Sequence, residues 1–382
     1  MAAPVAGDAV TVAVTATAAG TPSVTSRGDR VWLTWGEYDE ATQLADAFLA
    51  SSTDGGRSFG PPRNITGHGG VEGPRTVSAA DGTLFMSVLE WAAKPLVADF
   101  YPAWAQVYRS TDAGETWQRL GRAPGPSEMK VDPTQISLAV SDDGERVLVT
   151  WYDATPADHI PEGVPVAVEG TMSWPGWASV SMDGGRTFSA PRPAIPSACG
   201  CCSLEPFFRG DTPSIAFRAV TPIDSEKDER DVAITEYGAD GRWQTAVEVR
   251  DDRFTIPLAG CPSSGPGVAP SGHDTAVAWW TGAEGRTGFW FARSATPGSG
   301  EPTKILSSAT QIGDVEMAET PDGRHLVLVS TVDEVADEGH DRAGDDAPET
   351  TRRLRVFSVG EAIAELPDAD VEIPSEFEPW YS

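Results

Sequence analysis

Four cysteines are the residues whose type and spacing most clearly suggest chemistry. Three stand in one run, Cys199-Gly200-Cys201-Cys202, and the fourth is Cys261. Soft thiolate ligands favour copper(I) or zinc, so the four residues are candidate metal ligands. The C-x-C-C spacing differs from the C-x-x-C of a zinc ribbon. One or two disulfides, among them a strained vicinal bridge between Cys201 and Cys202, and free reactive thiols are the alternatives that the sequence leaves open.

A short internal repeat indicates which elements hold these residues. Its pattern is Ser-x-Asp-x-Gly-x-Ser/Thr-aromatic. In each copy the Asp is expected to accept backbone N–H bonds, the Gly to take a positive φ, and the aromatic side chain to pack between neighbouring blades of a β-propeller. We therefore expect a structural role for the three copies, Ser52-Thr-Asp-Gly-Gly-Arg-Ser-Phe59, Ser110-Thr-Asp-Ala-Gly-Glu-Thr-Trp117 and Ser181-Met-Asp-Gly-Gly-Arg-Thr-Phe188.

A second repeat, a Pro- or Gly-containing turn before a strand, predicts the number of blades. Each copy is followed by a Gly turn and a strongly apolar strand such as Arg30–Trp35 or Thr275–Trp280. The pattern predicts an all-β, six-bladed propeller of four-stranded antiparallel blades over residues 1–360, followed by an acidic C-terminal tail over 361–382. Val10–Thr15 is expected to pair with the last blade and close the ring. The predicted blade starts lie near residues 20, 72, 131, 204, 264 and 314.

The innermost strands of a propeller line its axis, and the loops entering them crowd one mouth of the central channel, where ligands bind by default. Alignment of the blade starts places an acidic ring at this mouth. The alternative is that these acids are only solvated groups in a protein that is acidic throughout. Cys202 and Cys261 precede consecutive blade starts, so they are expected to be neighbours. The candidate catalytic residues are Glu72, Arg75, Asp132 and Glu205, and Glu316 is a candidate substrate-binding residue.

Over nearly the whole chain, the three repeats resemble the Asp boxes (BNR repeats) of the sialidase superfamily. A narrower resemblance to bacterial sialidase-like proteins rests on the cysteine run, Arg218, Arg230-Asp231, Trp243 and Cys261-Pro-Ser-Ser-Gly-Pro266. The superfamily resemblance implies a six-bladed propeller. True sialidases bind the substrate carboxylate with three arginines, use a Tyr paired with a Glu as the nucleophile, and use an Asp as the general acid. The sequence does not match this set of residues securely. An acidic ring would also repel a sialic acid carboxylate, so strict sialidase activity is not expected.

The overall charge and the chain's opening residues narrow the possible partners and location. A formal net charge of −29 argues against binding nucleic acid or an anionic membrane surface. No stretch has the apolar length of a membrane span. The opening Met1–Gly7 resembles the end of a cleaved export signal with a Met added, which predicts an extracellular or periplasmic location.

Three hypotheses for function follow. The first is a glycan-binding propeller or a glycoside hydrolase, with paired carboxylates such as Asp132 and Glu205, and with Arg218, Trp174 and Trp177 contacting the sugar. The second is a copper or zinc protein centred on the cysteines, including a copper-dependent enzyme or a redox protein of the cell envelope. The third is a non-catalytic interaction scaffold with structural disulfides. The oligomeric state does not follow from the sequence.

Overall fold

The structure, a computed structural model, describes most of the chain. All regular secondary structure in this part is β-strand. The same residues include no helix of the length and apolarity needed to cross a bilayer. The described residues are 12, 18–39, 42, 44–91, 103–123, 133–153, 171–258, 260, 262–271, 274–308, 313–320, 322–334, 350–366 and 371–373.

Most strands form antiparallel sheets of four, each taken from one continuous stretch of chain. The first sheet contains β1 (Ala18–Arg27), β2 (Arg30–Asp39), β3 (Leu44–Ser52) and β4 (Arg63–Asn64). The second contains β5 (Val71–Ser78), β6 (Leu84–Trp91), β7 (Ala103–Ser110) and β8 (Gln118–Ala123). The third contains β9 (Pro133–Val140), β10 (Val147–Asp153), β11 (Ser173–Ser181) and β12 (Arg192–Cys199).

The second half of the chain repeats this plan with variations. The fourth sheet contains β13 (Glu205–Arg209), β14 (Thr212–Arg218), β17 (Val232–Glu236) and β18 (Val247–Glu248). The fifth contains β20 (Gly267–Ser271), β21 (Asp274–Thr281), β22 (Gly288–Ser294) and β23 (Thr303–Leu306). The sixth contains β24 (Glu316–Glu319), β25 (His325–Glu334), β26 (Thr350–Val359) and β27 (Ile363–Glu365), with β28 (Val371–Ile373) also paired to β26.

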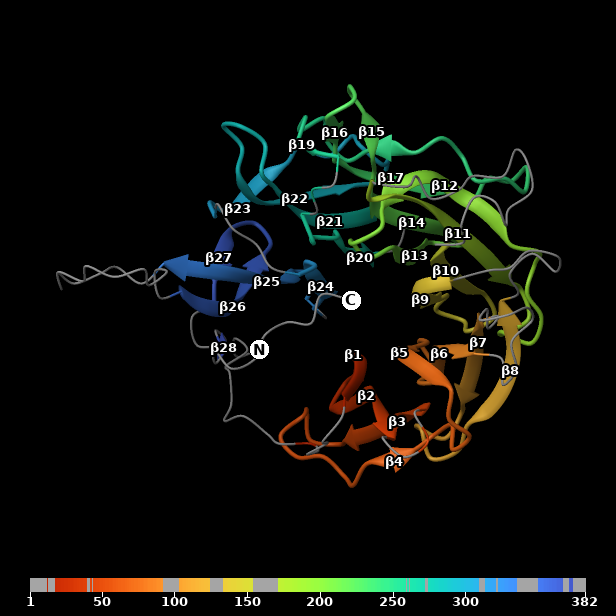
Figure 1. The fold of residues 1–382 in the computed structure, drawn as a ribbon. Helices are drawn as coiled ribbons and strands as arrows, with labels where there is room; N and C mark the ends of the chain where they lie inside the picture. The colour runs from red at the N-terminus through yellow and green to blue at the C-terminus, as the bar shows by residue number, and fades with distance from the viewer. Residues whose placement is uncertain are drawn as a thin grey trace.

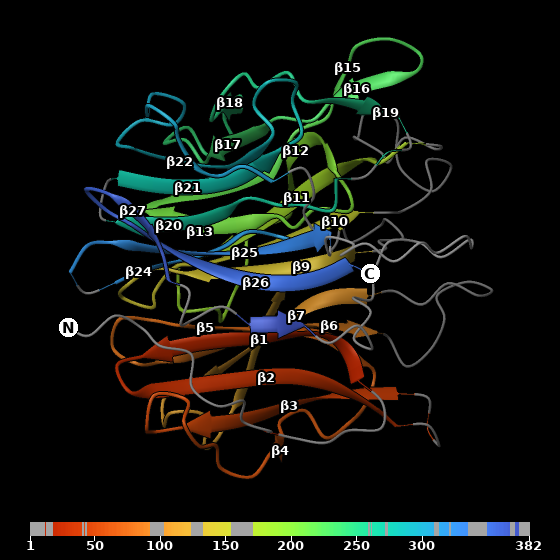
Figure 2. The same cartoon turned by 90° about the vertical axis from the view of Figure 1, so that its left-hand side faces the viewer.

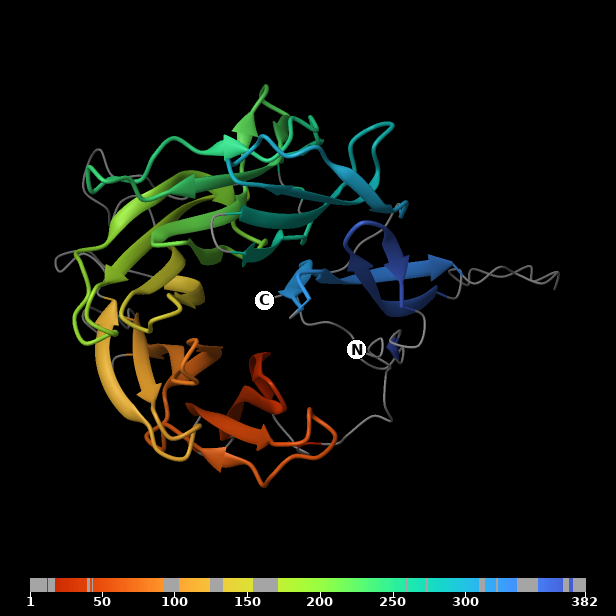
Figure 3. The ribbon, with the colours of Figure 1, turned by 180° about the vertical axis from the view of Figure 1, so that it is seen from behind.

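The sheets stand around a central axis like the blades of a propeller (Figure 1), and the view from behind shows the same ring (Figure 3). The strands nearest the axis are β1, β5, β9, β13, β20 and β24. Each begins within a few residues of a predicted blade start. The prediction of an all-β fold built from four-stranded antiparallel sheets is confirmed. Val10–Thr15, predicted to close the ring, lies outside the described residues.

Two features differ from the prediction. A small sheet of β15 (Thr221–Pro222), β16 (Lys227–Glu229) and β19 (Thr255–Pro257) stands on one face of the disc (Figure 2). The predicted acidic tail contains β27 and β28, which extend the last sheet. The sequence did not reveal these strands because each has only three residues or fewer, too few for a hydrophobic period.

Apolar packing between consecutive sheets stabilises the strands of each sheet. All seven residues of β10 are buried, because a strand covered on both faces carries a continuous apolar run. Separate apolar clusters lie between each pair of consecutive sheets from the first to the sixth. Large side chains such as Trp32, Trp151 and Trp279 fill them and are at most 2% exposed.

The three sequence repeats form turns with one shared hydrogen-bond pattern, after β3, β7 and β11. In the third turn Asp183 Oδ1 accepts from the Thr187 N–H at 2.9 Å, Asp183 Oδ2 accepts from the Thr187 hydroxyl at 2.7 Å, and the Gly185 N–H donates to Ser181 Oγ at 2.9 Å. The corresponding glycines have φ of 85°, 89° and 82°. Trp117 and Phe188 pack into the clusters between neighbouring sheets. The predicted role of these residues in the turns is confirmed.

These turns predict a specific loss of stability in acid. Hydrogen bonds from the turn's Ser or Thr residues lower the pKa of Asp112 and Asp183 to about 2. A lowered pKa stabilises the fold above the ordinary pKa of 3.8, and this stabilisation disappears as the pH falls toward about 2. Asp183→Asn is therefore expected to lower the Tm at neutral pH and to differ less from wild type near pH ~2, as measured by circular dichroism. An equal shift for Asp29→Asn, in the exposed turn after β1, would contradict a turn-specific role.

Candidate functional site

The innermost strands bring a group of charged side chains to the axis. Glu72 and Arg75 lie on β5, Glu205 begins β13, and Glu316 begins β24. Asp314 precedes β24 by two residues and acts electrostatically on both Glu205 and Glu316, as Arg75 also does. The alignment of blade starts therefore grouped Arg75, Glu205 and Glu316 as the structure does. Asp132 lies outside the described residues.

The surroundings of these carboxyl groups favour their neutral forms. Burial, followed by the charges of Glu316 and Asp314, raises the pKa of Glu205 well above its usual range, and Arg75 opposes this. Desolvation also raises the pKa of Glu316 and that of Glu72, while Arg75 acts against the shift at Glu316. Glu205 is partly exposed and Glu316 is exposed, so both carboxyl groups are accessible to solvent although nearby protein displaces much of their water. A carboxyl group that keeps its proton near neutral pH can serve as a general acid.

Asp314 connects this axial group to the cysteine run. Its carboxylate accepts hydrogen bonds from the Ser203 hydroxyl, next to Cys202, and from the Gly265 N–H before β20. The Val315 N–H donates in return to the Gly265 carbonyl at 3.2 Å. Three consecutive sheets are thus tied together where their inner strands begin.

The cysteine run forms a tight turn between β12 and β13. The Cys202 N–H donates to the Cys199 carbonyl at 3.0 Å, and the Tyr152 hydroxyl donates to the carbonyls of Cys199 at 3.0 Å and Cys202 at 2.8 Å. Cys199 Sγ lies 3.2 Å from Cys201 Sγ and 3.3 Å from Cys202 Sγ. Cys199 and Cys202 are free and fully buried, whereas Cys201 is partly buried and disulfide-bonded. The three sulfur atoms lie within 4.8 Å of one another, so this cluster could hold a metal ion.

Two buried guanidinium groups surround the cluster. Arg230, fully buried, donates to Cys199 Sγ at 3.1 Å and pairs with Asp228 at 2.9 Å. Arg218 donates to the carbonyls of Ser264, Arg230 and Trp280. The Cys202 S–H and the two guanidinium charges lower the pKa of Cys199 to about 6, whereas burial raises the pKa of Cys202.

The structure corrects part of the predicted substrate-binding set. Arg218 is 1% exposed, and each of its guanidinium nitrogens donates to a carbonyl, so it fixes loops and cannot reach a ligand. Trp177 is 3% exposed within the cluster between the second and third sheets, so it is not a sugar platform. Trp174 packs on Tyr152 and on Gly200, away from the axial carboxylates in the third strand of its sheet. Cys261 lies outside the described residues, but Ser264, three residues later, donates its N–H to Cys202 Sγ at 3.4 Å.

Sequence reasoning missed three contributors. Asp314 was noticed only as the start of the sixth blade and Tyr152 gave no signal, because only the folded chain brings them to the cysteine turn. Arg230 was noticed only as part of a resemblance. The one clue in the sequence to a structural role was that Arg230 stands close to two acidic residues, Asp228 and Asp231.

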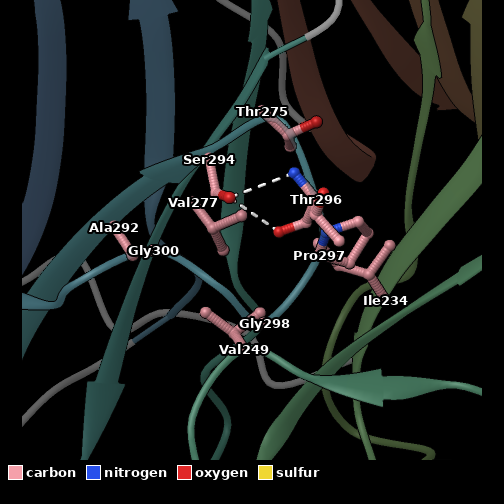
Figure 4. Close-up of a pocket in the computed structure, with 10 residues that line it drawn as sticks. All are labelled: Ile234, Val249, Thr275, Val277, Ala292, Ser294, Thr296, Pro297, Gly298 and Gly300. Atoms are coloured by element: carbon pink, nitrogen blue, oxygen red, sulfur yellow. Dashed lines mark hydrogen bonds between the residues drawn. The ribbon is translucent and has the colours of Figure 1, made fainter.

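A pocket between the fourth and fifth sheets lies on outer strands and does not include the axial group (Figure 4). Its lining is apolar or hydroxylic, with Ser294 bonded to Thr296, and has no titratable side chain. It therefore offers no acid, base or metal ligand. The lining residues are Ile234, Val249, Thr275, Val277, Ala292, Ser294, Thr296, Pro297, Gly298 and Gly300.

Comparisons with known proteins bear on the fold. No protein-family model matches the chain, and no curated protein matches it. An α-L-arabinanase of Penicillium chrysogenum, solved with arabinobiose, is similar over 83% of this chain and 90% of its own, at 14% identity and a TM-score of 0.51. A GH93 α-L-arabinofuranosidase of Fusarium graminearum is similar over 82% and 88%, at 13% identity and a TM-score of 0.52. The chain thus has a propeller fold of the kind found in glycoside hydrolases, and at these identities the likeness concerns the fold alone.

The buried arginine at this site allows a stability test. Arg218→Met would remove a charged donor from three buried carbonyl groups, at about 1–3 kcal/mol each. We expect the free energy of unfolding in urea to fall by about 3 kcal/mol or more. The matched control is Arg209→Met, which removes a partly exposed ion pair with Glu236 and should cost only about 1 kcal/mol. Equal losses for the two variants would refute the proposed role of Arg218.

Proposed function

We propose that this protein is an exported, six-bladed, glycosidase-like propeller that binds and hydrolyses glycans at the axial mouth. The observation that carries the proposal is the grouping of Glu205, Glu316 and Arg75 on inner strands, where burial raises the pKa of both carboxyl groups. Two carboxyl groups with different environments are what glycoside hydrolysis requires. The closing of the ring by the N-terminal segment and the export of the chain belong to the same proposal.

The groups divide naturally into an acid and a base. Glu205, whose pKa is raised the more strongly, donates a proton to the oxygen of the departing sugar. Glu316 experiences the opposing charge of Arg75 and, once ionised, acts as the base or nucleophile. Glu72 and the predicted Asp132 complete the acidic mouth. Several carboxyl groups facing one arginine favour a neutral sugar over a sialic acid, and arabinofuranosides are the first class to test given the names of the two similar enzymes.

Removing the acid should abolish turnover. Glu205→Gln cannot donate the proton, so hydrolysis of a responsive nitrophenyl glycoside should fall roughly 10²–10⁴-fold. The wild-type rate should fall as the pH rises through the raised pKa of Glu205, because the acid form is then lost, and this alkaline limb should be absent in the variant. The measurement is kcat/KM against pH.

Glu301→Gln, an exposed carboxylate on the loop before β23, is the control and should retain wild-type turnover. Unchanged turnover in Glu205→Gln would overturn the assignment of the acid. Failure of the wild type to hydrolyse or bind any member of a broad glycan panel would favour the scaffold hypothesis.

A soft metal ion, copper or zinc, at the cysteine cluster is the second candidate. The observation in its favour is the proximity of three sulfur atoms. Two observations weigh against it. The disulfide at Cys201 removes one thiolate, and the Arg230 guanidinium donates to the sulfur atom that a cation would need. We therefore rank this candidate below glycan hydrolysis.

Metal content tests the second candidate directly. Protein purified under reducing conditions should retain about one copper or zinc ion per chain if the cluster is a metal site. Cys202→Ser should then lose that ion, as measured by mass spectrometry of the metal. Retention of the metal in Cys202→Ser, or metal-free wild type after loading with copper(I) and zinc and desalting, would exclude the site.

A further inference from the structure

We propose that Cys199 and Cys202 form a redox-active dithiol that is oxidised to a Cys199–Cys202 disulfide by exchange with the disulfide at Cys201. This activity is independent of glycan hydrolysis at the axial mouth. It rests on the geometry of the cysteine turn and on the groups packed around it.

The two free cysteines are arranged as a C-x-x-C pair inside the longer run. The hydrogen bond from the Cys202 N–H to the Cys199 carbonyl closes the turn and brings the two sulfur atoms to 3.3 Å. The Tyr152 hydroxyl also bonds to the carbonyls of Cys199 and Cys202 and so stabilises the turn. Bond formation between the sulfur atoms therefore requires only a short approach within one turn. Cys201, 3.2 Å from Cys199 and less buried, is the sulfur through which the pair meets other thiols.

The environment makes the two thiols unequal. The groups that face Cys199 are the Cys202 S–H and the guanidinium groups of Arg230 and Arg218, which lower its pKa to about 6. Cys202 is fully buried. This burial, together with the negative charges of Cys199 and Asp314, raises the pKa of Cys202. One nucleophile and one resolving thiol in a short turn are the components of thiol–disulfide exchange.

The hydrogen bonds of the buried Arg230 also favour negative charge at Cys199. Arg230 Nε is buried and has no hydrogen-bond partner, although Arg230 Nη1 bonds to Cys199 Sγ and Nη2 to Asp228. A buried guanidinium is stable only beside compensating negative charge. Asp228 supplies part of that charge and Cys199, when ionised, supplies the rest, whereas a metal cation in the same place would repel Arg230.

The exchange balances without an external oxidant. The Cys199 thiolate attacks Cys201 Sγ and the existing disulfide at Cys201 breaks. The other sulfur of that disulfide leaves with the electron pair as a thiolate. Cys202 then attacks Cys199 Sγ, a Cys199–Cys202 bond forms, and Cys201 leaves as a thiolate that takes up the proton lost by Cys202. The dithiol loses two electrons, and the original disulfide gains them.

Mapping of disulfides in the folded protein tests the proposal. The protein is equilibrated in native buffer with mixtures of reduced and oxidised dithiothreitol, acid-quenched, alkylated and analysed by tandem mass spectrometry. Wild type should show a Cys199–Cys202 disulfide with Cys201 alkylated. Cys202→Ser should accumulate the Cys199–Cys201 intermediate, and Cys199→Ser should show neither. Exchange limited to Cys201 in all proteins, or thiols protected by a stoichiometric metal, would overturn the proposal.

A pH profile separates a reactive thiolate from a merely structural cluster. In wild type the exchange rate should rise with pH to a plateau above about 6. Arg230→Gln should raise the pKa of Cys199 and move this rise to higher pH, where a pKa higher by about 1 lowers the rate about tenfold at pH values well below it. The matched control is Arg209→Lys, remote from the cluster, which should keep the wild-type profile. An unshifted pH profile in a folded Arg230→Gln variant would contradict the role of Arg230. Glycan hydrolysis is measured in parallel and should survive in Cys202→Ser, because the two activities are independent.

Discussion

Apolar packing between consecutive sheets holds the strands whose starts carry the axial charges and the cysteine turn. Strands such as β10 are covered on both faces, so a sheet cannot slide without exposing the apolar clusters on either side. This constraint fixes where the inner strands begin, and it brings Arg75, Glu205 and Glu316 together from three different sheets. The same packing buries Cys199 and Cys202 fully, whereas Cys201 stays partly exposed. Charge inside the ring is therefore concentrated at strand starts.

Asp314 connects the two sites that this packing creates. Its carboxylate holds Ser203 and Gly265 and adds negative charge near Glu205 and Cys202. Both of these groups have raised pKa values for the same physical reason, namely burial next to a like charge. On the other side of the turn, Arg218 and Arg230 supply the opposite charge and lower the pKa of Cys199. Burial and a few nearby charges thus raise the pKa of Glu205 and Cys202 and lower that of Cys199 within adjoining loops.

Repeats in the sequence were sufficient to predict the main four-stranded sheets but not the small sheet of β15, β16 and β19, because each repeat marks a turn whose geometry depends on local residues such as Asp183 and Gly185. They also placed Arg75, Glu205 and Glu316 at equivalent strand starts. Contacts between different sheets could not be predicted in this way. Arg218 is of a residue type that often binds ligands. Only its three carbonyl partners in the folded protein show that its role is structural. Trp177 likewise lies in a strand that is almost entirely buried, and only contact with the neighbouring sheet shows that it is not available to a sugar.

The origin of each main sheet in one continuous stretch of chain has an evolutionary consequence. Duplication or deletion of a whole stretch adds or removes a complete hydrogen-bonded ladder and leaves the others intact. Circular permutation at a loop between sheets would preserve every ladder for the same reason. Such rearrangements are tolerated least between the third, fourth and fifth sheets, where Arg218 and the cysteine turn cross the boundaries, so that segment is expected to be inherited as one block.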